Sequence, residues 1–336
     1  MSEVPGVFPP GARVMFVGQA PAAEEVYYGR PFVGAAGREL NRWLFAAKVR
    51  RRHVAITNVF NEPIPAEGMP ALYTKERNGL PPIASGRWLI QSWHHHLERL
   101  RSEIEAHAPN IIVGLGGEAL WALRGALGID KCRGSVFSSL QGPKALCTFH
   151  PAYILRGGYK HRRTAIADLL KAVRESDTPD IRYRHRTLWI EPTLEDIRLF
   201  RDRYLRTAKL IAVDIETAKR RITHISFAPS RSLGISIPFV NEKGGSYWKT
   251  AEEEAAAWRL VRDICASPVR KLLQNGLYDA VWLWTQWGIP LVNYCEDTRL
   301  AHHALYPELP KGLRFMGAMW ENEQDWKGLS RHAEDD

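Results

Sequence analysis

In the first half of the chain, short apolar runs alternate with amphipathic stretches whose apolar positions recur at helical spacing. The apolar runs predict buried strands over residues 13–18, 54–59, 110–116 and 145–149. The amphipathic stretches predict helices over residues 35–48, 87–107, 117–124 and 161–174. Alternating strands and helices are typical of a parallel sheet with helices on both faces. We therefore expect a three-layer α/β domain over residues 1–175.

The pattern changes after a polar stretch at residues 176–186, which has no apolar periodicity and is interpreted as a linker. Three successive strands are predicted beyond it, at 209–215, 222–227 and 232–238. Helices are predicted at 251–265, 277–287 and 297–306. Strands that come first and helices that follow indicate a second, mixed α/β domain over residues 187–336.

Composition narrows the class of protein. The 336 residues are 45% hydrophobic and 25% charged, which excludes a disordered or fibrous chain. No apolar run reaches the ~18 residues of a membrane-spanning helix, and the N-terminus lacks the basic start and apolar core of a signal peptide. We therefore expect a cytoplasmic protein with no membrane partner. The four cysteines form no CxxC pair, which argues against a disulfide framework and against a classical zinc site.

The net charge of +9 is unevenly distributed. Residues 1–186 contain 26 Lys and Arg against 16 Asp and Glu, whereas the remainder contains 20 against 21. A basic half beside a neutral one indicates two domains. The first either faces a polyanion such as DNA or is simply a soluble basic domain.

Polar side chains follow three of the strands predicted in the first half. Gln19 and Ala20 come directly after the first strand, and Asn58 ends the second. The run HPAYILR, residues 150–156, follows the fourth. Because ligands bind beyond the carboxyl ends of parallel strands, we expect these three groups to meet at one crevice.

These motifs carry a resemblance to a known family. FVGQAP, GRPFVGAAG, TN and HPAYILR occur in the order and spacing of the uracil-DNA glycosylase superfamily. The chain most closely resembles family 4 of that superfamily, over about residues 10–175. The resemblance implies a DNA-repair enzyme of a bacterial or phage-infected cell. Such an enzyme flips uracil out of DNA and hydrolyses its N-glycosidic bond.

The resemblance also assigns roles within the expected crevice. Phe32 and Ala20 contact the flipped base, with the Phe32 ring against its face. The Asn58 amide matches the O4 and N3–H edge of uracil and mismatches that of cytosine. His150 stabilises the negative charge that grows on the uracil ring as the bond breaks.

The segment after His150 is expected to contact the DNA backbone and the base stack. Tyr153 and Leu155 wedge apolar atoms into the space that the flipped base leaves. Arg156, Lys160 and Arg162 clamp phosphates. The alternative for Arg162 is a solvated position at a helix start.

Two departures from family 4 change what the resemblance implies. Family 4 has Glu where this chain has Gln19, so the carboxylate that orients water is expected to be Glu25, or less favourably Glu24. Both glutamates also suit a helix start. Family 4 holds an iron–sulfur cluster with four cysteines, whereas this chain has no cysteine before Cys132. We therefore expect no cluster.

Three adjacent histidines, His94, His95 and His96, invite interpretation as a metal site. Neighbouring residues on a helix point about 100° apart, so the three rings cannot all converge on one ion. We therefore interpret the run as a solvated or half-buried helix face.

In the second half, carboxylates cluster after a predicted strand. Asp214 and Glu216 are two residues apart at the strand end and point to the same side, and Asp279 opens a helix. With the QNGLYD motif, these residues resemble the DnaQ-like 3′–5′ exonuclease domain of phage-type family A DNA polymerases over about residues 187–325. The resemblance implies a ribonuclease H-like fold and assigns the three carboxylates to Mg²⁺ or Mn²⁺.

The third exonuclease motif is not recognisable. The family needs a late Tyr or His four residues before an Asp, and His332 with Asp336 has this spacing only at the chain end. We interpret that pair as a coincidence and expect a C-terminally incomplete exonuclease domain of low or no activity. The alternative function is a catalytically weak or inactive DNA-binding accessory module that delivers DNA to a separate phage-type polymerase.

Overall fold

The computed structural model describes residues 3–321, which form two compact units. Among the described residues, the first unit comprises residues 3–182 together with residues 314–321, and the second comprises residues 183–313. Within the described residues, no helix is both long enough and apolar enough to span a membrane.

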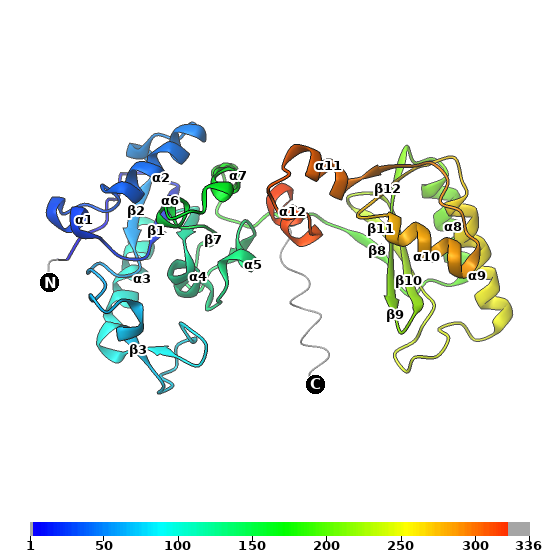
Figure 1. Ribbon diagram of the computed structural model, residues 1–336, viewed down its shortest axis with the longest axis horizontal. Helices are drawn as coiled ribbons and strands as arrows, with labels where there is room; N and C mark the ends of the chain where they lie inside the picture. Colours follow the sequence, from blue (N-terminus) through cyan, green and yellow to red (C-terminus); the bar gives the residue numbers. More distant parts are fainter. Residues whose placement is uncertain (1–2, 322–336) are drawn as a thin grey trace. The chain divides into compact units, whose positions relative to one another are not determined.

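The first unit is built on a five-stranded sheet of order β2–β1–β5–β7–β6 (Figure 1). Four of these strands run parallel: β1 (Val14–Gly18), β2 (Ala55–Asn58), β5 (Ile111–Leu115) and β7 (Lys144–Thr148). They confirm the predicted parallel sheet. A short antiparallel edge strand, β6 (Val136–Ser138), was not predicted from the apolar pattern.

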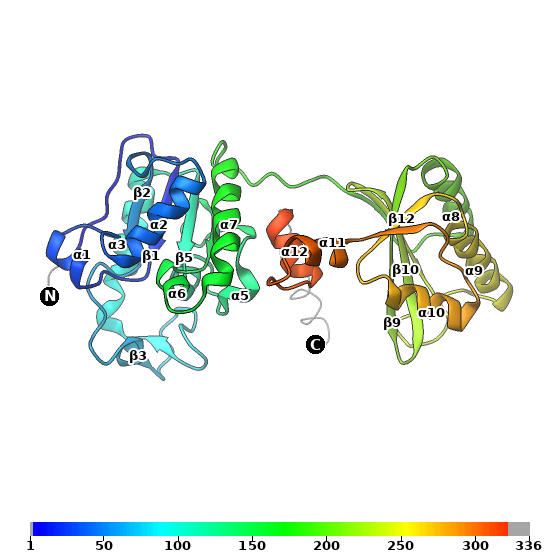
Figure 2. The same cartoon turned by 45° about the horizontal axis from the view of Figure 1, so that its top comes forward.

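Helices cover both faces of this sheet because successive side chains of a strand point to opposite sides. The helices of the unit are α1 (Ala23–Tyr28), α2 (Ala35–Ala46), α3 (His95–His107), α4 (Gly117–Arg124), α5 (Ile129–Cys132), α6 (Pro151–Leu155) and α7 (Arg162–Glu175). Phe16 of β1 belongs to a buried cluster with α2 and α7, and its neighbour Val17 belongs to another with α3 and α4. Figure 2 shows α7 lying beside β5. The expected three layers are therefore confirmed.

One predicted helix is wrong in its first part. The pattern at 87–107 predicts a single helix, but α3 begins only at His95. Before it, β4 (Trp88–Leu89) pairs with β3 (Tyr73–Thr74) in a small antiparallel sheet. Leu89 is fully buried in this sheet, so tertiary packing overrides the local helical periodicity.

The second unit contains a six-stranded mixed sheet of order β13–β12–β9–β10–β11–β8. Its strands are β8 (Thr187–Trp189), β9 (Leu210–Ala218), β10 (Arg221–Ser230), β11 (Leu233–Pro238), β12 (Arg270–Leu273) and β13 (Tyr294–Asp297). β9, β10 and β11 form the predicted antiparallel meander, and β12 and β13 continue it in parallel beside β9. A meander followed by two parallel strands in this order is the ribonuclease H-like arrangement that was expected.

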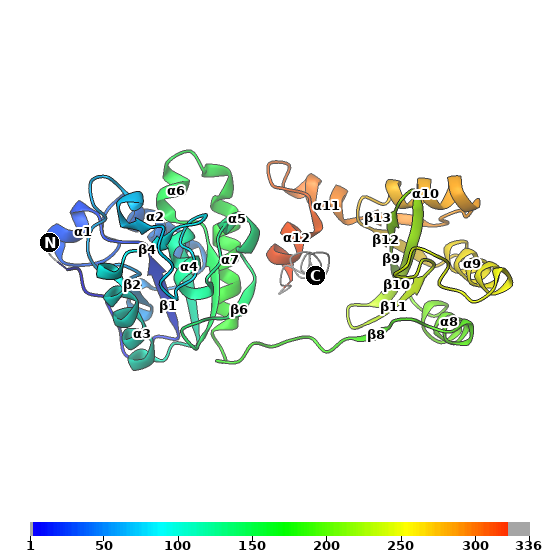
Figure 3. The ribbon, with the colours of Figure 1, turned by 90° about the horizontal axis from the view of Figure 1, so that it is seen from below.

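The helices of this unit are α8 (Leu194–Phe200), α9 (Ala251–Cys265), α10 (Leu277–Trp287) and α11 (Thr298–Leu305). Apolar residues of α8, α9 and α10 pack with alternate residues of the meander in one buried cluster. Figure 3 shows α8 and α9 beside the sheet. On β9 the same alternation exposes Asp214 and Glu216 while Ile215 between them is buried.

The last described helix, α12 (Leu313–Trp320), packs on the first unit rather than on the second. The Lys171 ammonium on α7 donates hydrogen bonds to the carbonyl oxygens of Gly134, Ala318 and Glu321. The Arg133 guanidinium lies over the Phe315 ring. We expected residues 187–336 to form one domain, and the packing of residues 314–321 differs from that expectation.

Candidate functional site

The carboxyl ends of β1, β2 and β7 gather side chains from segments that are far apart in the sequence. Gly18 lies opposite Asn58 in the parallel register of β1 and β2. β7 ends at Thr148, and His150 follows as the N-cap of α6. The rings of His150 and Phe32 lie 5.9 Å apart between their centroids. Asn58, Phe32 and His150 therefore share one edge of the sheet.

Asn58 presents an unpaired acceptor inside this edge. It is 4% exposed, and its Oδ1 has no hydrogen-bond partner among the described residues. Arg99 on α3 fixes the backbone around Asn58, because its guanidinium donates to the carbonyl oxygens of Asn58 at 2.6 Å and Val59 at 2.9 Å. A buried acceptor without a partner costs about 1–3 kcal/mol. A ligand that donates to Oδ1 would recover this free energy.

Gly18 and Gly37 make room for the Phe32 ring and its strained backbone. A Cβ atom on Gly18 would lie 2.3 Å from Asn58 Oδ1 and 2.5 Å from Phe32 Cζ. The Asn58 amide and the Phe32 ring edge therefore converge over a position that only glycine can occupy. Phe32 has a φ of +53°, and a Cβ on Gly37 would lie 1.8 Å from the Phe32 carbonyl oxygen.

His150 is held as a neutral donor. Its Nδ1 accepts a hydrogen bond from the Ala152 backbone N–H at 3.1 Å, which leaves the proton of the neutral ring on Nε2. Burial, together with the nearby Arg156 charge, lowers the pKa of His150 to about 4. At neutral pH the imidazole can therefore donate from Nε2 without carrying a charge.

Glu25 has the contacts of a carboxylate that braces a loop. It is 5% exposed, and its two oxygens accept from the backbone N–H groups of Gly34 at 2.8 Å and Ala22 at 3.1 Å. Glu24 is exposed and forms an ion pair with Arg38. Of the two glutamates, only Glu25 is buried, and it fixes the start of α1 against the segment that carries Phe32.

Gln19 and Ala20 lie half-buried just beyond β1. The backbone carbonyl of Gln19 accepts from Phe60 N–H at 2.9 Å, which ties this turn to the segment after β2. The Gln19 side chain makes no hydrogen bond within residues 3–321. Its amide is thus available to a ligand or to water.

The segment after His150 presents an aromatic side chain and two cations to solvent. Tyr153 is exposed and stacks on Phe149 with 5.4 Å between ring centroids. Arg156 and Lys160 are exposed, and Leu155 is half-buried. These four side chains lie on α6 and on the turn after it, close in sequence to His150.

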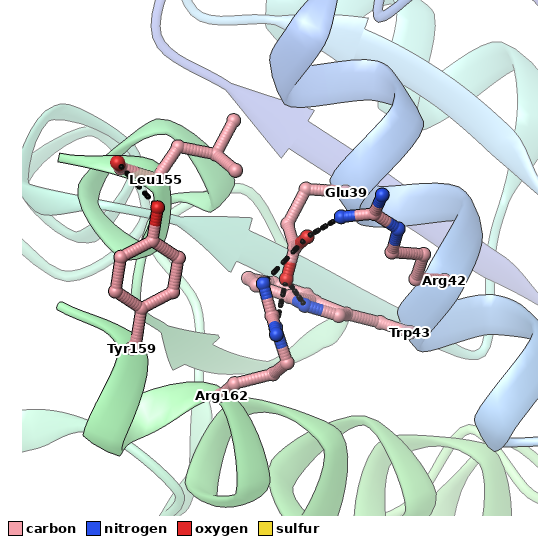
Figure 4. Close-up of polar contacts among 6 residues, drawn as sticks. All are labelled: Glu39, Arg42, Trp43, Leu155, Tyr159 and Arg162. Carbon is pink, nitrogen blue, oxygen red and sulfur yellow. Dashed lines mark hydrogen bonds and ion pairs between the residues drawn. The ribbon is translucent and has the colours of Figure 1, made fainter. Parts of the chain in front are cut away.

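Arg162 has a partner that its sequence position did not indicate. Its guanidinium donates to both oxygens of Glu39, at 2.6 and 3.1 Å, as Figure 4 shows. The buried Glu39 carboxylate also accepts from Arg42 at 3.0 Å and from Trp43 Nε1 at 2.9 Å. Burial alone would raise the pKa of Glu39, but these hydrogen bonds outweigh it and lower the pKa. Arg162 thus joins α7 to α2, which differs from the phosphate contact that we expected.

A basic cavity of about 470 Å³ adjoins the Phe32 segment. Phe32, Arg30, Arg51 and Arg52 help to line it, whereas Asn58 and His150 do not. Arg51 also donates to the Pro31 carbonyl oxygen at 2.8 Å and so supports the turn before Phe32. Arg30 belongs to the GRPFVGAAG motif, although the sequence assigned it no role, and the only sequence signal for Arg51 and Arg52 was the basic excess of the first half.

The cysteines of the first unit do not fit an iron–sulfur cluster. A cluster takes four thiolate ligands, and this unit contains only Cys132 and Cys147 within its described residues. Cys147 is fully buried in β7, and burial raises the pKa of its thiol well above the ordinary range. We therefore assign no step to such a cluster.

In the second unit, Asp279 meets β9 between Asp214 and Glu216. β9 pairs with β12 only as far as Ala212. Farther along β9, the backbone N–H of Ile215 donates to Asp279 Oδ1 at 3.0 Å. Burial, with the negative charges of Asp214 and Asp297, raises the pKa of Asp279 to about 6. Carboxylate oxygens are the ligands that Mg²⁺ and Mn²⁺ prefer. Within the described residues, however, Asp214, Glu216 and Asp279 do not place one oxygen each within 4.8 Å of the other two.

His332 and Asp336, which have the spacing of the third exonuclease motif, lie outside the described residues.

The fold and the site together define a class of protein. The first unit is a three-layer α/β domain. The amide of Asn58, the ring of Phe32 and the imidazole of His150 lie together at the carboxyl ends of its parallel strands. The model of the uracil DNA glycosylase superfamily matches residues 5–174. This chain belongs to that superfamily.

Relatives of known type match the same part of the chain. The type-4 uracil-DNA glycosylase of Thermotoga maritima is 36% identical over 163 residues, which cover 48% of this chain and 76% of the relative. That of Archaeoglobus fulgidus is 31% identical over 160 residues, which cover 45% and 71%.

Solved exonucleases match the chain at low identity. The EXD2 exonuclease domain soaked in Mn and GMP has a TM-score of 0.29 and 14% identity, covering 37% of this chain and 62% of that one. Escherichia coli RNase D, an exoribonuclease involved in structured RNA processing, has a TM-score of 0.31 and 18% identity, covering 44% and 36%. This chain thus spans less than two thirds of either structure.

Proposed function

We propose that this chain is a uracil-DNA glycosylase of base-excision repair, acting on uracil that has been flipped out of DNA. The observation that carries the proposal is the buried, unpartnered Oδ1 of Asn58 beside the Phe32 ring. In the bound state, Oδ1 accepts from uracil N3–H and the amide nitrogen donates to O4. Cytosine presents an acceptor and a donor at these positions, so it would be rejected.

His150 supplies the stabilisation of the leaving group in this proposal. As the bond between C1′ and N1 breaks, its electron pair passes to the uracil ring. The neutral Nε2–H of His150 then donates to O2, where negative charge accumulates. Its hydrogen bond strengthens toward the transition state, so the contribution appears in kcat rather than only in binding.

In this proposal, Gln19 orients water and Glu25 positions the Phe32 segment, two roles that a single acidic residue would otherwise combine. Gln19 has a free amide that orients the attacking water. Because an amide cannot take up a proton, the water proton passes to solvent as the new C1′–O bond forms. Glu25 positions the Phe32 segment through its two backbone hydrogen bonds. This arrangement predicts slow hydrolysis, limited by the absence of a general base.

DNA binding is assigned to the exposed cations near this site. Arg156 and Lys160 follow α6, and Arg30 and Arg52 line the basic cavity beside Phe32. Tyr153 and Leu155 enter the base stack in this proposal. Arg162 instead holds α7 in place through Glu39, and the enzyme works in the cytoplasm of a bacterial or phage-infected cell.

The test uses a labelled oligonucleotide with a single uracil, followed by alkali. Wild-type protein is expected to give a strand break, whereas His150→Ala and Asn58→Ala give little. An oligonucleotide with cytosine at the same position is the substrate control. Binding without cleavage by the wild type would refute the glycosylase.

That outcome would instead support the accessory module, which delivers DNA to a separate phage-type polymerase. Gln19 in place of the family glutamate is the observation that favours this alternative.

For the second unit, we propose that Asp214, Glu216 and Asp279 hold Mg²⁺ or Mn²⁺, which would activate water at a DNA 3′ end. The position of Asp279 beside β9, where it accepts from Ile215 N–H between Asp214 and Glu216, supports this assignment. A 3′-labelled oligonucleotide with either cation tests it, with Asp214→Ala as the control. Equal degradation by wild type and variant would show that this site is not an exonuclease.

A further inference from the structure

A second cluster of ligating side chains lies outside the sites described above. Glu62, in the segment after β2, and His95 and His96, at the start of α3, each place a donor atom within 4.8 Å of the other two. His94, the first histidine of the run, is not part of this group and therefore differs in role from His95. Its Nε2 lies instead near the Leu89 carbonyl oxygen and Asn78.

Both imidazoles have the orientation that metal ligands usually have. His96 Nδ1 lies 2.7 Å from Asn61 Oδ1, and His95 Nδ1 lies 2.8 Å from the Ser92 carbonyl oxygen. Because an oxygen acceptor places the ring proton on Nδ1, each Nε2 keeps its lone pair. His96 is fully buried, and its Nε2 has no partner among the described residues.

The two adjacent rings converge more closely than regular helical spacing predicts. His95 is the first residue of α3, and its ring turns back toward Ser92. Its centroid consequently lies 4.0 Å from that of His96. The interpretation of the whole run as one helix face therefore does not describe these residues, because His94 precedes α3 as its N-cap and His95 and His96 form a pair.

We propose that Glu62, His95 and His96 bind one Zn²⁺ ion, with water completing a tetrahedral site. Two imidazoles and one carboxylate are a ligand set that Zn²⁺ favours. Bonds of about 2.0–2.1 Å place tetrahedral ligand atoms about 3.4 Å apart. The separations between the three ligating atoms must therefore shorten by at most about 1.4 Å. The exposed His95 and the half-buried Glu62 are free to make this movement.

The ion would join the same elements that Arg99 already joins. Glu62 follows Asn58 by four residues, and Arg99 on α3 holds the Asn58 and Val59 carbonyl oxygens. Zn²⁺ between Glu62 and α3 would add a second link across this segment. Metal binding itself does not depend on the proposed glycosylase activity.

The experiment titrates tag-free full-length protein with Zn²⁺ by calorimetry and with Co²⁺ by visible absorption, which reports tetrahedral coordination. Wild type is expected to bind one ion at this site, with a rise in Tm. Glu62→Gln and His95→Ala should each weaken binding at least about tenfold. His303→Ala, an exposed histidine of the second unit, is the matched control.

The Tm of each variant without metal separates a lost ligand from a damaged fold, since Glu62 and His95 are not buried. Absence of binding by the wild type would overturn the proposal. Unchanged affinity in both ligand variants would do so as well, because the ion would then lie elsewhere.

Discussion

Replacing Gly18 by alanine should remove uracil excision while leaving the protein folded. The added Cβ would lie 2.3 Å from Asn58 Oδ1 and 2.5 Å from Phe32 Cζ, where ordinary contacts begin near 3.4 Å. Each atom is therefore overlapped by about 1 Å, and either the amide or the ring must move. Both are groups that we propose to contact uracil.

The expected magnitude follows from the hydrogen bonds at stake. Displacing the Asn58 amide leaves its bonds to uracil poorly made, at a cost of about 3 kcal/mol in the transition state. This corresponds to a loss of roughly 150-fold in kcat/KM. Crowding the site should also lower the free energy of unfolding by about 1–3 kcal/mol.

The assay is single-turnover excision from a uracil-containing oligonucleotide, with urea unfolding of the same preparations. Gly117→Ala is the matched control, because a Cβ on this exposed first residue of α4 meets no atom within 4 Å. We expect the control to stay within about threefold of wild type. The reasoning fails if folded Gly18→Ala protein keeps activity in that range, or if both variants lose activity equally.

Three further perturbations test other parts of the structure. The lowered pKa of His150 means that the unfolded chain binds a proton below about pH 6.5 that the native state refuses until about pH 4. Acidification from pH 7 to 5 should therefore cost wild type about 2 kcal/mol of unfolding free energy more than His150→Asn, and equal slopes in urea titrations would contradict this. Glu39→Gln should destabilise the first unit by about 3 kcal/mol, because Arg162 loses its buried partner. Glu24→Gln, at an exposed ion pair, should change stability by less than about 0.5 kcal/mol; similar losses in both would refute the role of burial. Asp279→Asn should abolish the rise in Tm that Mn²⁺ gives the wild type, and a full rise in the variant would exclude Asp279 as a ligand.

The parallel sheet of the first unit could be predicted because its strands are continuous apolar runs. Asn58, at the end of one such run, and His150, just beyond another, lie where the topology of a parallel sheet requires. The same logic found the meander of the second unit. It missed β8, β12 and β13, which are short and carry polar or charged residues such as Arg270 and Glu296.

Partners that are distant in sequence could not be predicted from local pattern. Arg162 reads as a surface cation until the fold brings Glu39, on α2, within 2.6 Å of it. Likewise, nothing near Lys171 in the sequence indicates that its ammonium donates to the carbonyl oxygens of Ala318 on α12 and of Glu321 just after it. Such contacts depend on tertiary packing, whereas apolar periodicity reports only which side of an element is buried.

The position of α12 has a consequence for the covalent architecture. The chain leaves the first unit near residue 182, builds the second unit, and returns at residue 314. The second unit is therefore an insertion, joined to its host at two points rather than one. A single protease cut within residues 176–186 would leave both parts connected through residues 313 and 314, so their release as separate fragments requires two cuts.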